Sequence, residues 1–211
     1  MSLPPVEIPL GAMRFNSDSQ KLEYWMGSAW MQIQTFSSNL DGGVRGVYAG
    51  GSQGPPGPAT NEIQFFTIST QGDAADFGDL TKERNPASMG SNVRGVFASG
   101  SPGQGPYYTN EMDFITFSST GNATDFGDTG ATGANIATSS NQTRGILMGG
   151  RNPTRNTIEF ITIATTGNAS DFGDLTAAKR QGASVASPTR AIYAGGFDDT
   201  NRINNIEFVT I

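Results

Sequence analysis

The chain of 211 residues contains no cysteine and no histidine. Thiol nucleophiles, disulfides and the usual Cys/His zinc sites are therefore excluded, and so is any catalytic triad that uses imidazole as its base. Because most familiar hydrolases depend on one of these groups, the composition argues against an enzyme. We expect neither a catalytic metal nor an organic cofactor.

Basic residues are also scarce: Lys and Arg number 13 against 19 acidic residues, for a net charge of −6. They are scattered along the chain, which argues against nucleic acid as a partner. No apolar run approaches the roughly 20 residues of a membrane span, and the first residues lack the pattern of a signal peptide, so we expect neither membrane insertion nor an export signal. With 28 Gly and 11 Pro, a helical bundle is disfavoured and a folded, loop-rich, mostly β protein remains.

One short motif recurs four times along the chain. RGVYAGG and its variants RGVFASG, RGILMGG and RAIYAGG begin at Arg45, Arg94, Arg144 and Arg190, at spacings of 49, 50 and 46 residues. Each is followed by an Asn-led apolar block, the first being NEIQFFTI from Asn61. Three of the four are followed in turn by a block of the form TGNAxDFGDL, and the fourth repeat lacks this block within the sequence. The period indicates a repeat architecture.

Each repeat predicts about four short strands. In the first Asn-led block, Ile63 and Phe65 fall on one face and Phe66 and Ile68 on the other, so this strand must be covered twice. The glycine pairs Gly50–Gly51, Gly149–Gly150 and Gly195–Gly196 end the preceding Arg-led strand and permit a positive φ or a close backbone approach. This pattern resembles a β-propeller blade of the kelch kind. We therefore expect an all-β fold with about four kelch-like β-propeller repeats of 46–50 residues, either closed by an N-terminal strand or left open and completed by another chain.

Residues 1–38 precede the repeat domain, which spans residues 39–211. Within them, Ile8–Ile33 predicts a small β meander with turns at Asn16–Ser19 and Met26–Ser28. Three short strands bury too little surface to be stable alone, so this module needs a partner. We assign to it virion attachment or oligomerisation for the reason given next, and its candidate assembly residues are Phe15, Tyr24, Trp25 and Trp30.

The segment GAMRFNSDSQKLEYWMGSAW, from Gly11 to Trp30, resembles one that is common in tailed-phage virion and tail-fibre proteins, of the form GxxRFNxDxxKLEYxxGxxW. The repeats resemble arrays in fibre proteins of marine and cyanobacterial phages. Together the resemblances imply a structural virion protein, such as a short tail fibre, knob or capsid-decorating fibre, that is assembled in the host cytoplasm. They also imply other virion proteins as partners and a homo-oligomer, with a trimer favoured.

The loops between the glycine pair and the Asn-led block differ most among the repeats. We call them the variable loops: Ser52–Thr60, Ser101–Thr109, Arg151–Arg155 and Phe197–Asn204. Equivalent loops of a propeller emerge on one face, where variation on a constant framework is typical of recognition. Aromatic rings stack on sugars and Arg or Asp binds hydroxyls, which makes a host-surface glycan the candidate ligand. The candidate ligand-binding residues are Tyr107, Tyr108, Arg151, Arg155, Phe197, Asp198, Asp199 and Arg202.

The DFGD motif spells the magnesium-binding DFG of protein kinases, but three copies and the absence of a catalytic HRD segment exclude that interpretation. Calcium ligation by Asp73, Asp76 and Asp79 is an alternative, although Asn122 and Asn168 replace the first aspartate in later copies. We favour the interpretation that these acidic residues form turns and do not bind calcium. A further hypothesis pairs the DFGD aspartates with the four repeated arginines in a structural ladder.

These observations predict a non-enzymatic phage virion protein that displays its repeats outward and binds the host surface. The alternative is a free carbohydrate- or protein-binding β-propeller without a virion role. A monomer with affinity for sugars would favour that alternative.

Overall fold

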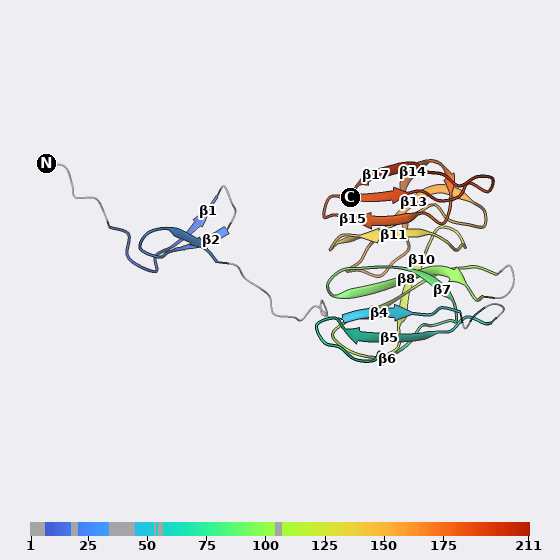
Figure 1. Cartoon of the computed structure of the whole chain (residues 1–211), viewed down its shortest axis with the longest axis horizontal. Helices are drawn as coiled ribbons and strands as arrows, with labels where there is room; N and C mark the ends of the chain where they lie inside the picture. Colours follow the sequence, from blue (N-terminus) through green and yellow to red (C-terminus); the bar gives the residue numbers. More distant parts are fainter. Residues whose placement is uncertain (1–6, 18–20, 34–44, 53, 55–56, 104–106) are drawn as a thin grey trace. The chain divides into compact units, whose positions relative to one another are not determined.

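The computed structural model describes residues 7–17, 21–33, 45–52, 54, 57–103 and 107–211. Within these residues the protein has seventeen strands and no helix, so the predicted all-β class is confirmed (Figure 1). None of the described residues forms a helix that is long and apolar enough to cross a membrane. The chain divides into two compact units, Met1–Ser38 and Asn39–Ile211.

The first unit is a three-stranded antiparallel meander, as the sequence predicts. Its strands are β1 (Met13–Asn16), β2 (Lys21–Trp25) and β3 (Trp30–Gln32), in the order β1-β2-β3. The turn between β2 and β3 lies where the sequence places it, and the Met26 amide donates to the Ala29 carbonyl across it (3.0 Å). The other predicted turn, Asn16–Ser19, includes residues 18 and 19, which lie outside the described residues.

The second unit contains four antiparallel sheets, one for each repeat. The first sheet consists of β4 (Arg45–Ala49), β5 (Glu62–Thr67) and β6 (Ala75–Asp79). The second consists of β7 (Asn85–Gly90), β8 (Arg94–Ser101), β9 (Thr109–Thr116) and β10 (Thr124–Asp128). The third consists of β11 (Ala137–Ser140), β12 (Arg144–Met148), β13 (Arg155–Thr162) and β14 (Ser170–Lys179). The fourth consists of β15 (Ala183–Ala186), β16 (Arg190–Ala194) and β17 (Ile206–Thr210).

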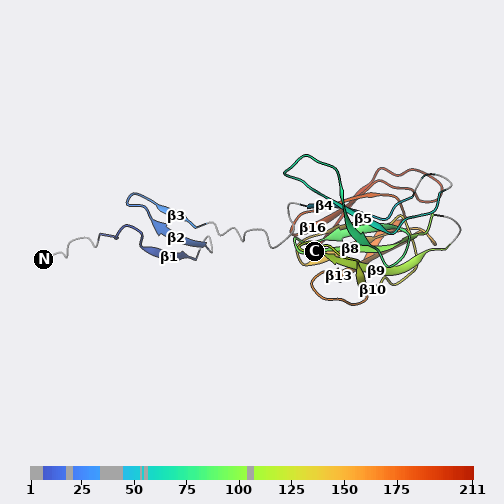
Figure 2. The same cartoon turned by 90° about the horizontal axis from the view of Figure 1, so that it is seen from below.

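The four sheets stack face to face in chain order, and the view turned by 90° shows them overlapping (Figures 1 and 2). The small-residue strands β7, β11 and β15 lie side by side along one column of the stack. Small side chains allow this approach: Thr138 Oγ1 donates to the Ser88 carbonyl (2.7 Å), and Ser140 Oγ donates to the Gly90 carbonyl (2.6 Å). Among the described residues the stack is open and does not close into a ring. The exposure of large apolar side chains on its two end sheets shows this.

Hydrophobic cores fill the three junctions between successive sheets. We call the face of a sheet that points to the next repeat its forward face, and the opposite one its rear face. At the first junction Ile63 and Phe77 on a forward face meet Phe97 and Ile115 on a rear face. In the second and third sheets both faces of the Asn-led strand are buried, which confirms that this strand is covered twice there. In the first sheet Phe66 is 48% exposed, so within one chain the Asn-led strand of the first repeat is covered on one face only.

The DFGD motif forms a β-bulge. Gln64 pairs with Asp76 and Ile63 pairs with Gly78, so Phe77 is the extra residue between them. The same shift occurs at the second and third DFGD strands, where Phe126 and Phe172 are the extra residues. A bulge turns a side chain out of the ordinary alternation. Here it places each DFG phenylalanine in the core between its own sheet and the next one.

The first and second bulges each contact the TGNA turn of the following repeat. The Gly121 amide donates to the Phe77 carbonyl (2.7 Å) and the Asp79 amide donates to Asn122 Oδ1 (3.1 Å). One repeat later, Gly167 and Asn168 make the same bonds to the second DFGD strand. The approach is close: a Cβ at Gly78, whose φ is +143°, would lie 2.5 Å from the Gly121 carbonyl. The motif therefore connects repeats.

The repeated arginines do not pair with the DFGD aspartates, so that hypothesis is wrong. Each guanidinium stacks on a phenylalanine of its own sheet, with 4.6–5.1 Å to the ring centroid. Arg45 Nη1 donates to the Phe117 carbonyl (2.5 Å), and Arg94 Nη1 donates to the Ala164 carbonyl (2.9 Å), in each case at the next repeat. A carbonyl satisfies the partly buried guanidinium in place of the predicted carboxylate.

A second polar contact crosses every junction, and the sequence analysis missed it. The segment after each DFGD motif binds a carboxylate on the next sheet. Thr81 Oγ1 donates to Asp113 (2.8 Å), the Gly130 amide to Glu159 (2.8 Å) and Thr176 Oγ1 to Glu207 (2.7 Å). A cation joins the first and third contacts: Arg84 pairs with Asp113 at 2.8 Å, and Lys179 pairs with Glu207. The signal in the sequence is an acid at one fixed position of repeats two to four.

Candidate functional site

The variable loops begin directly after the glycine pairs, whose residues have positive φ values. Gly149 and Gly150 have φ of +63° and +126°, and the Gly150 amide donates to the Lys179 carbonyl (3.0 Å). A Cβ at Gly149 would lie 2.4 Å from that carbonyl. Both reasons given from the sequence, the positive φ and the close backbone approach, hold here. The variable loops therefore start from a fixed point in each repeat.

The variable loops of the third and fourth repeats come together around Asp199. Its carboxylate accepts hydrogen bonds from Thr154 of the third repeat and from Arg180 Nε (2.8 Å). These bonds, followed by the charges of Arg180 and Arg151, hold the pKa of Asp199 below its ordinary value. The Arg180 guanidinium also lies over the Phe197 ring, 4.9 Å from its centroid. We call Arg151, Thr154, Arg180, Phe197 and Asp199 the loop cluster.

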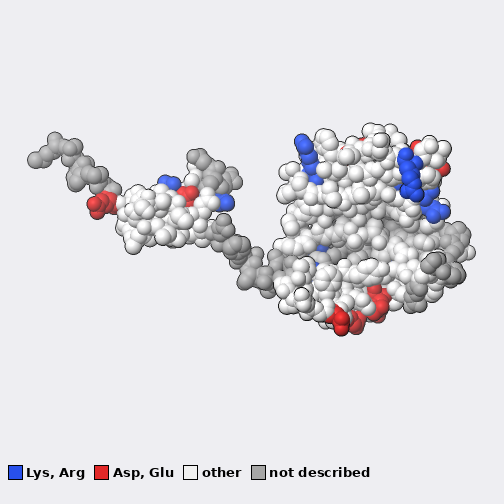
Figure 3. Space-filling view, in the orientation of Figure 1, with Lys and Arg blue, Asp and Glu red and all other residues white. Residues whose placement is uncertain are grey.

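Backbone pairing fixes the loop cluster. Phe197 pairs with both Arg180 and Arg202, and Arg151 pairs with Ala134 of the preceding segment. Figure 3 shows basic and acidic side chains next to each other at the upper right of the stack, on the side where the loops emerge. The loop cluster thus brings together a half-buried aromatic ring, a guanidinium whose side chain is only 15% exposed and an exposed carboxylate. This is chemistry that binds vicinal hydroxyls and sugar faces.

The other candidate ligand-binding residues have different roles. Arg155 is half-buried and donates to the carbonyls of Gly149 and Thr132 (both 3.2 Å), and burial lowers its pKa. Asp198 accepts from the amides of Thr200 (2.9 Å) and Asn201 (2.6 Å), which lowers its pKa and makes it a turn former. Arg155 therefore supports the loops from within. Arg202 is exposed.

The tyrosines of the second repeat lie apart in their contacts. Tyr107 is 75% exposed and Tyr108 is half-buried, and no described contact joins either one to the loop cluster. The sequence reasoning grouped four loops, and the described contacts join them in two pairs. The third and fourth loops meet in the loop cluster, and the Ala59 amide of the first loop donates to the Pro102 carbonyl of the second (3.1 Å). It missed Arg180, which lies directly after β14 and outside every variable loop. No motif marks that residue.

The candidate assembly residues are distributed over the three strands of the first unit, with Phe15 on β1, Tyr24 and Trp25 on β2, and Trp30 on β3. Trp25 and Trp30 pack at 5.5 Å between ring centroids, and Arg14 lies over the Trp30 ring at 4.2 Å. Tyr24 Oη donates to Met26 Sδ (3.3 Å). Phe15 is 66% exposed. The tryptophans therefore stabilise the meander itself, and Phe15 is the aromatic residue it presents to solvent.

Glu23 of β2 is buried and binds two side chains of β1. Its carboxylate accepts from Asn16 Nδ2 (3.0 Å) and from Arg14 Nε (2.9 Å), and these two bonds hold its pKa below the ordinary value. The contact ties β1 to β2. The motif RFNxDxxKLE thus has a structural role within the meander.

No acidic cluster that could hold a metal ion is present among the described residues. Asp76 Oδ1 instead accepts a hydrogen bond from the Gly78 amide (3.2 Å), a short-range contact across the bulge at Phe77 within β6. The DFGD aspartates are accounted for by this geometry and by the repeat connection described above.

No protein-family model matches the chain, and no curated protein matches it.

Proposed function

We propose that the protein is a non-enzymatic structural component of a tailed-phage particle, with a kelch-like repeat stack that displays its variable loops outward. The observation that carries the proposal is how the repeated polar groups are used. The repeated arginines and the acids at the junctions bind neighbouring strands or the next repeat, as a scaffold requires. A catalytic site needs a unique constellation of groups, whereas these recur from repeat to repeat.

The first unit supports the same proposal. It is a small sheet that exposes Leu10, Met13 and Phe15. Such a sheet is marginal in isolation and gains stability by binding another surface. Its sequence resembles a segment of tailed-phage virion proteins, which makes another virion protein or a second copy of this unit the expected partner.

The kelch-like assignment rests on the strand order of the repeats. Each complete sheet has the small-residue strand at one edge and the DFGD strand at the other, and the small-residue strands line one column. This is the order of a propeller blade whose first strand lies nearest the axis.

Labelling of purified phage particles with an antibody to the chain tests the virion role. We expect gold label at one defined location on the particles in electron micrographs, and loss of label on particles lacking the gene product. Absence of the chain from purified particles, together with its presence as a free protein in the lysate, would overturn the virion role and favour a free binding protein.

The loop cluster supports host-surface glycan binding as the activity of the displayed end. The full-length chain is expected to compete with particles for adsorption to host cells. An Arg180→Ala, Phe197→Ala double variant should lose this competition, whereas Lys82→Ala, an exposed residue outside the loop cluster, should retain it. Equal competition by both variants would exclude the loop cluster as the receptor site.

A further inference from the structure

The two ends of the repeat stack present the two halves of the interface that joins the repeats inside it. At each internal junction a forward face packs on a rear face. The rear face offers one residue from the Arg-led strand and one from the Asn-led strand: Phe97 with Ile115, Leu147 with Ile161, and Tyr193 with Val209. The internal junctions therefore show which residues pack against a forward face and which pack against a rear face.

The rear face of the first sheet has large apolar residues at the equivalent positions, but no sheet of the described stack covers it. Tyr48, Phe66 and Ile68 stand at the repeat positions of Phe97, Ile115 and Phe117, and they are 62%, 48% and 62% exposed. Their counterparts Phe97 and Ile115 are 4% and 3% exposed. Large aromatic and aliphatic side chains on one sheet face are costly to leave in water.

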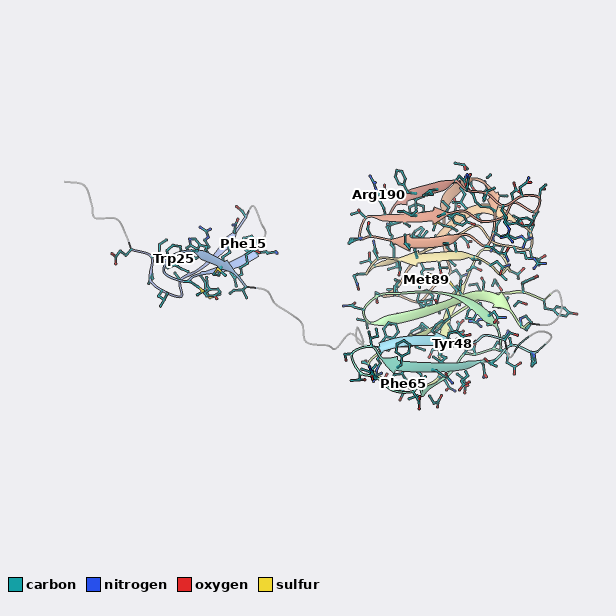
Figure 4. The ribbon with its side chains drawn as sticks, in the orientation of Figure 1. Phe15, Trp25, Tyr48, Phe65, Met89 and Arg190 are labelled. Carbon is teal, nitrogen blue, oxygen red and sulfur yellow. The ribbon has the colours of Figure 1, made fainter. Side chains whose placement is uncertain are left out.

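The forward face of the fourth sheet is uncovered in the same way. Ile206 and Phe208 stand at the positions of Ile63 and Phe65, and they are 73% and 61% exposed, whereas Ile63 is fully buried. Figure 4 shows Arg190, of the fourth sheet, at one end of the stack, Met89 in its middle, and Tyr48 and Phe65 of the first sheet at the other end.

The polar groups of the two end faces also match. Arg190 stacks on Phe208 as Arg45 stacks on Phe65, and Arg45 donates to the carbonyl of Phe117 on the following sheet. The residue at the position of Phe117 in the first repeat is Ile68. Its carbonyl is therefore the acceptor that the repeat geometry assigns to Arg190.

The first repeat differs at one informative position. Asp113, Glu159 and Glu207 each bind the segment after the preceding DFGD motif, whereas the first repeat has Gln64 there. A carboxylate buried without that segment would be an unpaired charge. The neutral amide of Gln64 allows the rear face of the first sheet to be buried by a sheet that offers no such segment.

We propose that a second copy of this chain stacks head to tail on the first, with the rear face of its first sheet against the forward face of the fourth sheet. The contact repeats the internal junctions, and Arg190 of one copy donates to the Ile68 carbonyl of the other. Because the two faces differ, the interface is heterologous and leaves one free face at each end of a pair, so association continues into a ring or a filament. The inference is independent of a virion role.

Light scattering of the full-length chain at increasing concentration tests this contact. We expect the mass to rise with concentration, and we expect Phe66→Glu and Phe208→Glu each to abolish that rise, because each buries an unpaired carboxylate in the contact. Association should weaken by roughly 100-fold or more. Both residues are exposed in the single chain, so circular dichroism should be unchanged. Tyr107→Glu, an exposed aromatic on neither end face, is the matched control and should behave as the wild type.

Mixing the two variants decides the geometry. Each variant retains one intact face, so an equimolar mixture should form a complex of greater mass than either variant alone. A wild-type chain that stays monomeric at every concentration would overturn the inference, and so would a mixture that fails to associate. Oligomers that persist in both variants and are lost in Phe15→Ser would also overturn it, while leaving assembly through the first unit intact.

Discussion

The second and fourth sheets are built from the same strand pattern, yet they differ greatly in burial. Almost all of β8 is buried, whereas β17 alternates between half-buried and exposed positions. The second sheet has a neighbour on both faces and the fourth sheet has a neighbour only on its rear face within the described stack. The comparison shows that a repeat obtains its core from the adjacent repeats, as expected of a stacked array.

The largest difference is expected at the buried carboxylate of the second sheet. Asp113 and Arg84 are both 1% exposed and pair at 2.8 Å. Asp113→Asn leaves the Arg84 charge buried without its partner, which should lower the free energy of unfolding by about 3–5 kcal/mol. Gln64→Ala, at the same repeat position in the first sheet, should change it by less than about 0.5 kcal/mol. Urea denaturation measures both, and equal losses would contradict the comparison.

The DFG phenylalanines should show the next largest contrast. Phe126 is buried between the second and third sheets, so Phe126→Ala should cost about 3–5 kcal/mol. Phe172 is half-buried at the third junction, where no TGNA turn follows, and Phe172→Ala should cost clearly less. Thermal unfolding of the two variants under one set of conditions provides the measurement. A loss at Phe172 as large as that at Phe126 would show that the last junction is as well packed as the inner one.

The glycines of the DFGD strands sharpen the comparison to a single methyl group. Gly127 and Gly173 have nearly the same φ, +135° and +140°, so an alanine is strained at both. A Cβ at Gly127 would also lie 2.5 Å from the Gly167 carbonyl, whereas at Gly173 no atom lies within 4 Å. Gly127→Ala should therefore cost about 1–3 kcal/mol more than Gly173→Ala in the free energy of unfolding. Equal losses would mean that backbone strain alone accounts for both.

The smallest effect is a pH dependence at the last junction. Burial raises the pKa of Glu207, but the hydrogen bonds from Lys179 and Thr176 outweigh it and hold the pKa below its ordinary value of 4.5. A carboxylate with a lowered pKa stabilises the fold above its unfolded-state pKa, and this contribution is lost as the pH falls through the folded-state pKa. The stability difference between the wild type and Glu207→Gln should shrink as the pH is lowered below about 4.5. A stability difference that does not vary with pH would show that the charge of Glu207 does not stabilise the fold through Lys179.

The sequence predicts the strands well because the same strand pattern recurs in each of the four repeats. The Arg-led and Asn-led blocks form strands in every sheet, and the glycine pairs end the first of them. The partners of the repeated arginines could not be predicted, because the bulge at Phe77 and its equivalents changes which groups lie near the next repeat. A period-two pattern contains no sign of such a bulge. The carbonyls of Phe117 and Ala164 are the acceptors that the fold places within reach of Arg45 and Arg94.

The candidate site was predictable in its location and less so in its membership. The variable loops were found by comparing repeats, and Arg151, Phe197 and Asp199 do meet. Arg180 was missed and Arg155 was misplaced because contacts between loops depend on which backbone carbonyls lie within reach. Such contacts leave no periodic pattern in a single sequence.

The connection between each DFGD strand and the next TGNA turn has a consequence for synthesis of the chain. The Asp79 amide binds Asn122, 43 residues further along, and the same bond in the next repeat spans 40 residues. At roughly 5–20 residues per second, a newly made sheet waits about 2–9 seconds before the ribosome supplies the segment that completes its forward face. Each emerging repeat therefore passes through a period in which its phenylalanine is exposed, and the nascent chain buries its core one repeat behind the site of translation.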